Sequence, residues 1–371
     1  MKYTLCITHQ CNLNCKYCYI QKNEMAMTLE TAEKILSFAF ENTPHNEHIE
    51  LAFFGGEPLL RFSFLEELFA LILSYSQNYK RMPICSITTN GTIFSSKIAS
   101  FIQERNISFC ISCDGPSEIH DRARPYANGK GSFSAVEKTI RRAIRSLGNV
   151  SVNSVYNNES LAALPDTIRF LSDLGVRYIY LNPEVYCKWT KRDIDNISRV
   201  YDEIGQQYLR YFELGRPHFI SLIDAKIALI LRGGYDRLER CRMGHGEYAF
   251  AANGNVFGCE RLIGNGSEQL HCIGNIANFP ISHDHQSPPH RDEEISENDC
   301  VACSLSDYCA HWCSCSNYHS TSHYKKPSAF TCASERSALK VAFNILNEHT
   351  EIVSRFYDHV AGMPRTTATV T

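Results

Sequence analysis

The sequence predicts an α/β fold in which a parallel sheet curls into a full or partial barrel and a small cysteine-rich region follows it. Between residues 49 and 182, short apolar runs alternate with longer amphipathic stretches, which is the pattern of repeated strand–helix units. After about residue 182 this alternation stops, and cysteines then accumulate between residues 241 and 332. These observations separate a large barrel-like part from a smaller one.

The expected strands and helices follow one another in order. The strand-like runs cover residues 49–54, 84–88, 108–113, 150–155 and 178–182. The helix-like segments, several of which open on a capping Ser or Thr, cover residues 28–41, 62–79, 95–105, 132–148 and 160–174. In parallel sheets of this kind the chemistry lies at the carboxyl ends of the strands.

The second half of the chain is expected to contain longer helices and a hairpin. Helical stretches at 191–212 and 220–232 lead to the cysteine-rich region, where Asn253-Gly254 predicts a β-hairpin within 247–260. A polar loop is expected at 280–298 and a last helix at 334–356. We expect four parts: a barrel at 1–215, a linking helix at 216–240, a cysteine-rich domain at 241–335, and a helix with a disordered tail at 336–371.

Composition excludes several classes of protein. The 371 residues carry a net charge of −3, so no general basic field attracts nucleic acid or an anionic membrane. The sequence shows neither a secretion signal nor an apolar run long enough to span a bilayer, and we expect a cytoplasmic protein. In a reducing compartment many of its 17 cysteines are then expected to bind metal. Cys85 and Cys110 lie in strand-like runs and are interpreted as small buried hydrophobes.

The first cysteine group is Cys11, Cys15 and Cys18, with the spacing C-x3-C-x2-C. Three thiolates on one loop can hold three irons of a 4Fe–4S cluster and leave the fourth iron open to a small ligand. A zinc site completed by a distant residue is the alternative interpretation of this group.

Three further motifs follow predicted strands. They are Gly55-Gly56-Glu57-Pro58, Thr88-Thr89-Asn90-Gly91, and Ser112-Cys113-Asp114-Gly115-Pro116 with Arg124 shortly after it. Glycines let the backbone approach a ligand, a carboxylate can accept hydrogen bonds from an ammonium group, and an arginine can bind a carboxylate. Each motif alone could be an ordinary turn, and the neighbouring Arg122 could be an ordinary exposed charge.

In order and placement these motifs resemble the radical S-adenosylmethionine (SAM) superfamily. The resemblance implies a partial, TIM-like (β/α)6 barrel and a 4Fe–4S cluster on Cys11, Cys15 and Cys18 whose open iron binds SAM. Reductive cleavage of SAM then yields a 5′-deoxyadenosyl radical. The resemblance also implies SAM contacts by Tyr17, Gly55, Gly56, Glu57, Asn90, Ser112, Asp114 and Arg124.

The second cysteine group resembles the SPASM domain of peptide- and protein-modifying radical SAM enzymes. It comprises Cys241 and Cys259, then Cys300-x2-Cys303-x5-Cys309-x3-Cys313, and finally Cys332. The resemblance implies two auxiliary 4Fe–4S clusters. The first would be held by Cys241, Cys259 and Cys313, and the second by Cys300, Cys303, Cys309 and Cys332. Structural zinc sites are the alternative.

The first auxiliary cluster has only three ligands assigned in this way. Related sulfatase-maturing enzymes have an extra cysteine shortly after the first one, whereas residues 242–258 contain none. The cluster therefore either has an open iron, which could hold a substrate thiolate for carbon–sulfur bond formation, or takes a ligand from Cys272 or Cys315.

The resemblance implies a radical SAM/SPASM maturase that abstracts hydrogen from a ribosomally made peptide and installs a thioether, another crosslink or an oxidation. The alternatives are an anaerobic sulfatase-maturing enzyme that makes formylglycine, and a zinc-stabilised binding protein without activity. Expected partners are a peptide or protein substrate and an electron donor such as flavodoxin or ferredoxin. Only ten residues precede Cys11, so either the core binds the substrate or a separate leader-peptide-binding protein presents it.

Candidates for acid–base catalysis follow the strand predicted at 178–182. Glu184, Tyr186 and Cys187 lie there on the expected face, although a solvated loop is the alternative interpretation for each.

Overall fold

The structure is a computed structural model that describes all residues except 237–238, 268–269, 279–299, 301, 350–351 and 353–371. Three expected features therefore lie outside the described residues. They are the loop at 280–298, the disordered tail, and the end of the last helix except for residue 352.

One ten-stranded sheet organises the fold, in the order β10-β9-β8-β1-β2-β3-β4-β5-β6-β7. Strands β1 to β7 run parallel to their neighbours, and this confirms the predicted curled parallel sheet. The strands are β1 Lys2–Thr8, β2 Glu50–Gly55, β3 Ile84–Thr89, β4 Ser108–Ser112, β5 Ser151–Tyr156, β6 Tyr178–Pro183, β7 Phe219–Ile220, β8 Glu247–Phe250, β9 Asn255–Phe257 and β10 Cys272–Asn275.

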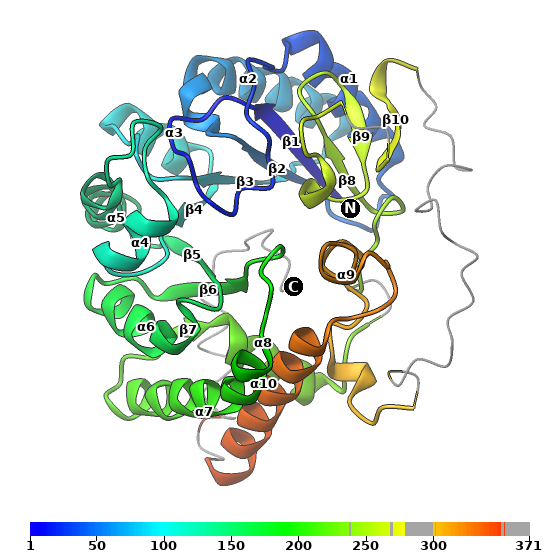
Figure 1. The fold of residues 1–371 in the computed structure, drawn as a ribbon. Coiled ribbons are helices and arrows are strands. Elements are labelled where there is room, and N and C mark those ends of the chain that lie inside the picture. The colour runs from blue at the N-terminus through cyan, green and yellow to red at the C-terminus, as the bar shows by residue number, and fades with distance from the viewer. Residues whose placement is uncertain (237–238, 268–269, 279–299, 301, 350–351, 353–371) are drawn as a thin grey trace.

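Helices cover the outer side of the parallel strands, as Figure 1 shows for α1 to α6. Two of them open on expected side-chain caps, because Thr28 and Ser95 each accept a backbone N–H of the first turn. Thr190 caps a further helix in the same way, whereas Ser132 and Ser160 make no such capping hydrogen bond. The helices are α1 Leu29–Asn42, α2 Phe62–Tyr79, α3 Ser96–Glu104, α4 Ser117–Ala123, α5 Phe133–Leu147, α6 Leu164–Asp173, α7 Lys191–Glu213, α8 Ser221–Arg232, α9 Ser314–Thr321 and α10 Ala329–Glu348.

The last helix begins earlier than the sequence analysis expects. Helix α10 starts at Ala329 rather than at Ser334, because Ser328 caps it by accepting the backbone N–H of Thr331. The helix therefore includes Cys332, which lies in its first turns.

The first strand was not predicted from the sequence. In β1, Lys2, Thr4 and Thr8 interrupt the apolar pattern, yet every residue from Tyr3 to Thr8 is buried. The strand is buried because it lies between β2 and β8, with Leu5 opposite Phe53 on one side and Phe250 on the other. Such burial is a property of the assembled sheet and not of the local sequence.

The hairpin predicted around Asn253-Gly254 is confirmed, since β8 and β9 are antiparallel neighbours. It does not stand apart from the barrel, because β8 also pairs in parallel with β1. In Figure 1 the hairpin lies beside β1, and α9 faces the open side of the curled sheet. The second cysteine group is thereby brought towards the carboxyl ends of the barrel strands.

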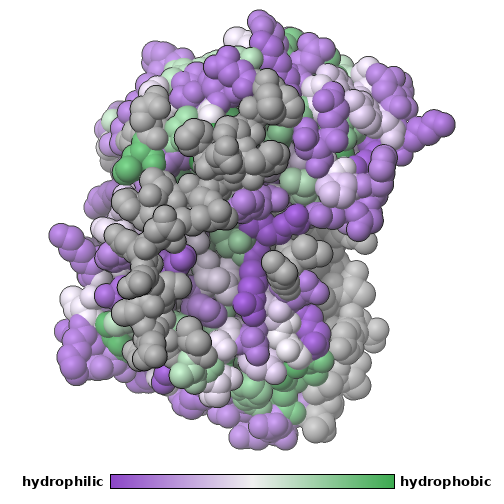
Figure 2. Space-filling model, turned by 90° about the vertical axis from the view of Figure 1, so that its right-hand side faces the viewer, coloured by the Kyte–Doolittle hydropathy of each residue, from purple (hydrophilic) through white to green (hydrophobic). Residues whose placement is uncertain are grey.

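A main apolar core lies between the sheet and the helices, and a smaller core joins β1 to the cysteine-rich region through Cys6, Ala249, Phe257, Cys313 and Cys315. On the face shown in Figure 2, most of the visible described residues are hydrophilic and the hydrophobic ones are scattered. Within the described part of the chain, no helix has the length and apolar character needed to cross a membrane.

Candidate functional site

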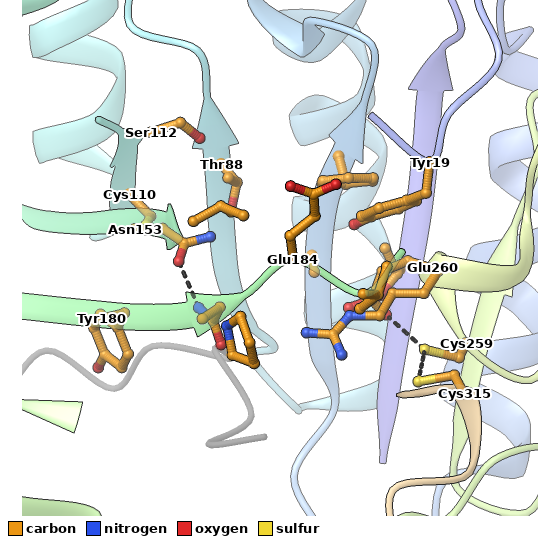
Figure 3. Close-up of a pocket in the computed structure, with 18 of the residues that line it drawn as sticks. Tyr19, Thr88, Cys110, Ser112, Asn153, Tyr180, Glu184, Cys259, Glu260 and Cys315 are labelled. Atoms are coloured by element: carbon orange, nitrogen blue, oxygen red, sulfur yellow. Dashed lines mark hydrogen bonds between the residues drawn. The ribbon is translucent and has the colours of Figure 1, made fainter. Parts of the chain in front are cut away.

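A cavity of about 300 Å³ lies inside the curled sheet and reaches the carboxyl ends of the barrel strands, since both Ser108 and Ser112, the first and last residues of β4, line it. It is lined by the first cysteine group and by part of the second one, together with residues of the strand ends: Cys11, Cys15, Cys18, Cys241, Cys259, Cys313 and Cys315. Figure 3 shows Thr88, Ser112 and Asn153 around one part of this cavity, and Cys259 with Cys315 in another. The fold thus joins in one site two motifs that are more than 220 residues apart in the sequence.

The loop after β1 carries the first cysteine group. Cys11 accepts a hydrogen bond from the backbone N–H of Leu13 at 3.4 Å and lies 3.6 Å from the side-chain nitrogen of Asn90. Burial raises the pKa of the Cys15 thiol to about 11, and the Arg124 guanidinium opposes this shift. A cationic neighbour of this kind favours a thiolate, which is the form that binds metal.

The loop that carries the first cysteine group requires the two glycines at the end of β2, Gly55 within the strand and Gly56 directly after it. A Cβ atom on Gly55 would lie 2.4 Å from the carbonyl oxygen of Thr8, and one on Gly56 would lie 2.1 Å from that of Gln10. The absence of a Cβ lets the end of β2 pack against the backbone that leads into Cys11. Both glycines also line the cavity, and their expected contact with a ligand stays a prediction.

Glu57 is completely buried and is not among the residues that line the cavity. Its carboxylate accepts hydrogen bonds from Leu59 N at 3.0 Å, Thr89 Oγ1 at 2.8 Å and Asn90 N at 2.6 Å. The expected contact of Glu57 with SAM stays a prediction. In the structure Glu57 ties the turn after β2 to the end of β3, and it thereby fixes Asn90 beside Cys11.

Asp114 is a second buried acid that holds its neighbours in place. It accepts hydrogen bonds from Tyr17 Oη at 2.5 Å, Arg124 Nε at 2.9 Å and the backbone N–H of Val155 at 3.0 Å. Arg124 also lies over the Tyr17 ring, 5.1 Å from its centroid. Tyr17, Ser112 and Arg124 line the cavity, whereas Asp114 supports two of them from behind.

Two residues near Arg124 were not assigned a role from the sequence. His120 accepts the backbone N–H of Asp114 at 3.3 Å and lies 3.0 Å from the hydroxyl of Ser132, which donates to the Arg124 carbonyl at 2.6 Å. Burial lowers the pKa of His120 to about 4, so the ring is neutral near pH 7. The position of Arg124 is therefore fixed at both its side chain and its backbone.

The second cysteine group divides into two sets. Cys241, Cys259, Cys313 and Cys315 line the main cavity, whereas Cys300, Cys303, Cys309 and Cys332 line a separate small pocket. This division is the one that the resemblance to the SPASM domain implies, with Cys315 added to the first set.

The three candidates for acid–base chemistry lie in different surroundings. Glu184 lines the cavity and accepts a hydrogen bond from Asn157 Nδ2 at 3.0 Å; in Figure 3 its carboxylate reaches into the space beside Tyr19. Tyr186 is exposed and lies edge-on to His319, with ring centroids 4.6 Å apart. Burial raises the pKa of the Cys187 thiol to about 11. Of the three, only Glu184 lines the cavity.

Cys85 and Cys110 are buried, as predicted. In the described part of the chain, no three or more His, Cys, Asp or Glu side chains converge so as to hold a single metal ion. An iron–sulfur cluster does not require that convergence, since each thiolate binds a different iron atom. The three thiols that line the cavity at Cys11, Cys15 and Cys18 are soft donors that suit such a cluster.

Comparison with known proteins agrees with this fold. The radical SAM superfamily model matches residues 5–171, which contain the first cysteine group and the strand-end motifs. The chain belongs to this superfamily and is an enzyme. Membership implies SAM and a 4Fe–4S cluster as cofactors.

Among individual relatives, an uncharacterised protein of Methanocaldococcus jannaschii is 30% identical over 73% of this chain and 86% of its own length. The radical SAM cyclopropyl synthase TigE of Paramaledivibacter caminithermalis is 24% identical over 83% of this chain and 66% of its own. A cysteine-type anaerobic sulfatase-maturating enzyme of Clostridium novyi is 31% identical, but the match spans only 47% of this chain and 48% of that enzyme.

Solved structures share the fold over most of the chain. The enzyme anSMEcpe, solved with AdoMet and the Cp18Cys peptide, has a TM-score of 0.77 at 20% identity and covers 94% of this chain and 99% of its own. Streptococcus suis SuiB, solved with its precursor peptide SuiA, has a TM-score of 0.59 at 15% identity and covers 88% of this chain and 75% of its own.

Proposed function

We propose that this enzyme modifies a peptide or protein substrate by radical chemistry, and that its C-terminal region is a SPASM domain with two auxiliary clusters. The observation that carries the proposal is one cavity lined by the first cysteine group, by Cys241, Cys259 and Cys313 of the second group, and by Cys315. A substrate bound there would lie between a site that starts a radical and a site that exchanges an electron. The peptide-bound structures of anSMEcpe and SuiB support a peptide as the substrate.

The residues of the chain would divide the work as follows. Cys11, Cys15 and Cys18 hold the cluster which, with SAM and one electron from a flavodoxin or ferredoxin, supplies the 5′-deoxyadenosyl radical. Asp114 accepts a hydrogen bond from the Nε of Arg124 and so fixes the guanidinium. The other N–H groups of this planar guanidinium would bind the carboxylate of SAM. Tyr17 flanks the adenine.

Glu184 is proposed to accept the proton that an oxidised substrate loses. It is an acid at the carboxyl end of β6, its carboxylate lies in the cavity, and Asn157 holds it through a hydrogen bond. The product would be a thioether, another crosslink or an oxidised side chain on a ribosomally made peptide, which a separate leader-peptide-binding protein could present.

Formylglycine formation is the second candidate. The match of fold to anSMEcpe over 94% of this chain favours it, and so does the relative from Clostridium novyi. The two candidates differ in their product, because formylglycine formation on cysteine removes the sulfur, whereas a thioether keeps it and loses only hydrogen. Mass spectrometry of a cysteine-containing peptide after turnover separates them.

The test of the proposed function is anaerobic reconstitution with iron and sulfide, followed by addition of SAM and dithionite. We expect iron–sulfur absorption and formation of 5′-deoxyadenosine. In the Cys11→Ala/Cys15→Ala/Cys18→Ala variant the absorption should be diminished and 5′-deoxyadenosine should be absent. No 5′-deoxyadenosine from fully loaded wild-type enzyme would overturn the proposal.

A matched pair of variants tests the SAM site. Arg124→Lys loses the fixed bond to Asp114 and should weaken SAM binding about 10- to 100-fold, because hydrogen bonds to charged groups contribute roughly 1.5–3 kcal/mol. Arg122→Lys is the control, since Arg122 is exposed and pairs with Glu159 at 3.6 Å. Equal SAM affinities in the two variants would contradict the role of Arg124.

A further inference from the structure

We propose that Cys315 is the fourth thiolate ligand of the first auxiliary cluster, beside Cys241, Cys259 and Cys313, and that this cluster therefore has no open iron. The inference deepens the proposed function and rests on it for the presence of the cluster. It decides between the two alternatives left by the sequence, an open iron and a ligand taken from elsewhere.

The contacts of the sulfur atoms carry the inference. Cys315 Sγ lies 3.4 Å from Cys259 Sγ and 3.8 Å from Cys313 Sγ, and the Cys315 side chain is buried. Figure 3 shows Cys315 and Cys259 pointing toward one another from segments that are far apart in the sequence. Cys241 lines the same cavity as these three cysteines. Four thiols from three segments of the chain therefore surround one part of the cavity.

Local structure places Cys315 there. Cys313 is the N-cap of α9 and Cys315 is the second residue of the helix, so both come from one turn. The hairpin β8–β9 brings Cys259 to the same place, because Cys259 lies two residues after the end of β9. Since β8 is fixed in register against β1, the hairpin that leads to Cys259 is tied to the barrel sheet.

Cys272, the other residue that could supply a ligand, lies differently. It begins β10, where it is paired with Phe257, and its thiol donates to the carbonyl of Gly274 at 3.1 Å. It does not line the cavity that the other four cysteines share.

The surroundings of the four thiols suit a cluster. The smaller core packs Ile20, Ala249, Ala251 and Phe257 near Cys313 and Cys315, which excludes water. Arg261, two residues after Cys259, lines the same cavity and brings a positive charge beside these thiols. A buried cation beside several thiolates offsets their negative charge.

The consequence concerns the reaction. With four protein thiolates no iron is free to bind the sulfur of a substrate, so the cluster is restricted to electron exchange. The substrate must then be held by the protein side chains of the cavity.

The experiment uses the full chain in which Cys11, Cys15 and Cys18 are replaced by alanine, so that only the auxiliary clusters can form. After anaerobic reconstitution we expect about eight iron atoms per chain, four for each cubane. Added β-mercaptoethanol should leave the electron paramagnetic resonance spectrum of the reduced protein unchanged. A thiol-dependent change in this parent protein would show an open iron and overturn the inference without any further substitution.

Three single substitutions in that background complete the test. Cys315→Ser should lose iron or yield a three-iron cluster and should become sensitive to β-mercaptoethanol, whereas Cys272→Ser should match the parent. Cys85→Ser is the control for replacing a buried cysteine outside the cavity. An unchanged iron count and spectrum in Cys315→Ser would refute the ligand role, even if wild-type enzyme forms 5′-deoxyadenosine and so upholds the proposed function.

Discussion

At the scale of single residues, the site depends on buried acids that do not line the cavity. Glu57 and Asp114 each accept three hydrogen bonds from the chain, and through them they position Asn90, Tyr17 and Arg124. An acid in a turn that follows a strand is easily interpreted as a ligand contact. Here the geometry assigns these two acids to the support of residues that do face the cavity.

Glu57 should make stability depend on pH. Burial raises its pKa from 4.5 to about 7, although three hydrogen bonds lower it. Between these two values the unfolded chain has lost the proton while the folded chain keeps it. The free energy of unfolding should therefore fall as the pH rises through this window, by roughly 3 kcal/mol in total.

The substitution Glu57→Gln removes this titration, because glutamine stays neutral. Anaerobic urea unfolding of wild type and variant between about pH 5 and 8 should show a stability difference that changes with pH. Glu67→Gln on the exposed side of α2 is the control and should follow the wild type. A difference between wild type and Glu57→Gln that is constant across this range would contradict the prediction.

At the scale of secondary structure elements, the hairpin β8–β9 links the two cysteine groups. Its first strand extends the barrel sheet through β1, and its second strand leads to Cys259. The turn between them needs Gly254, whose φ is +84° and whose Cβ position would lie 2.9 Å from Ile276 Cγ2. The turn is thus constrained by its backbone and by its packing.

Gly254→Ala should separate these two constraints when it is compared with Gly129→Ala. Both glycines have a positive φ, of +84° and +81°, but no heavy atom lies within 4 Å of the Cβ position at Gly129. The backbone penalty, about 1 kcal/mol, should appear in both variants, and Gly254→Ala should lose additional stability by crowding Ile276. Equal urea midpoints for the two variants would show that packing at the hairpin adds nothing.

At the scale of the whole molecule, the C-terminal part completes the barrel. Strand β8 covers the edge of β1, and α10 packs against α7 and α8. A buried ion pair between Lys226 of α8 and Glu335 of α10, 2.7 Å apart, adds to this contact. The barrel and the cysteine-rich region therefore share one sheet, and residues of both belong to the main apolar core.

A chain that ends at residue 240 should consequently fail to fold as an independent barrel. It would expose the edge of β1 and the faces of α7 and α8 that α10 covers, and exposed strand edges promote aggregation. We expect loss of a cooperative thermal transition by circular dichroism and aggregation on gel filtration, with the full chain as the control. A monomeric fragment that melts cooperatively would show that the barrel is autonomous.

Much of the fold could be predicted from the sequence, because strands β2 to β6 and helices α1 to α3 carry strong local patterns and lie within a residue or two of the predicted bounds. Strand β1 could not be predicted in this way, since its burial comes from neighbours on both sides. The short helices α4 and α9 were missed as well. They are too short for periodicity to distinguish them from turns.

The sequence by itself determined the chemistry of this protein: the spacing of Cys11, Cys15 and Cys18 and the strand-end motifs identify the superfamily, because ligand type and local spacing are written in the chain. Only the tertiary structure decided which residues share a cavity. It turned Glu57 and Asp114 away from the cavity and brought Cys315 against Cys259, 56 positions apart in the sequence. The physical reason is that such contacts depend on the register of β8 against β1 and on the packing of α9, which no local pattern encodes.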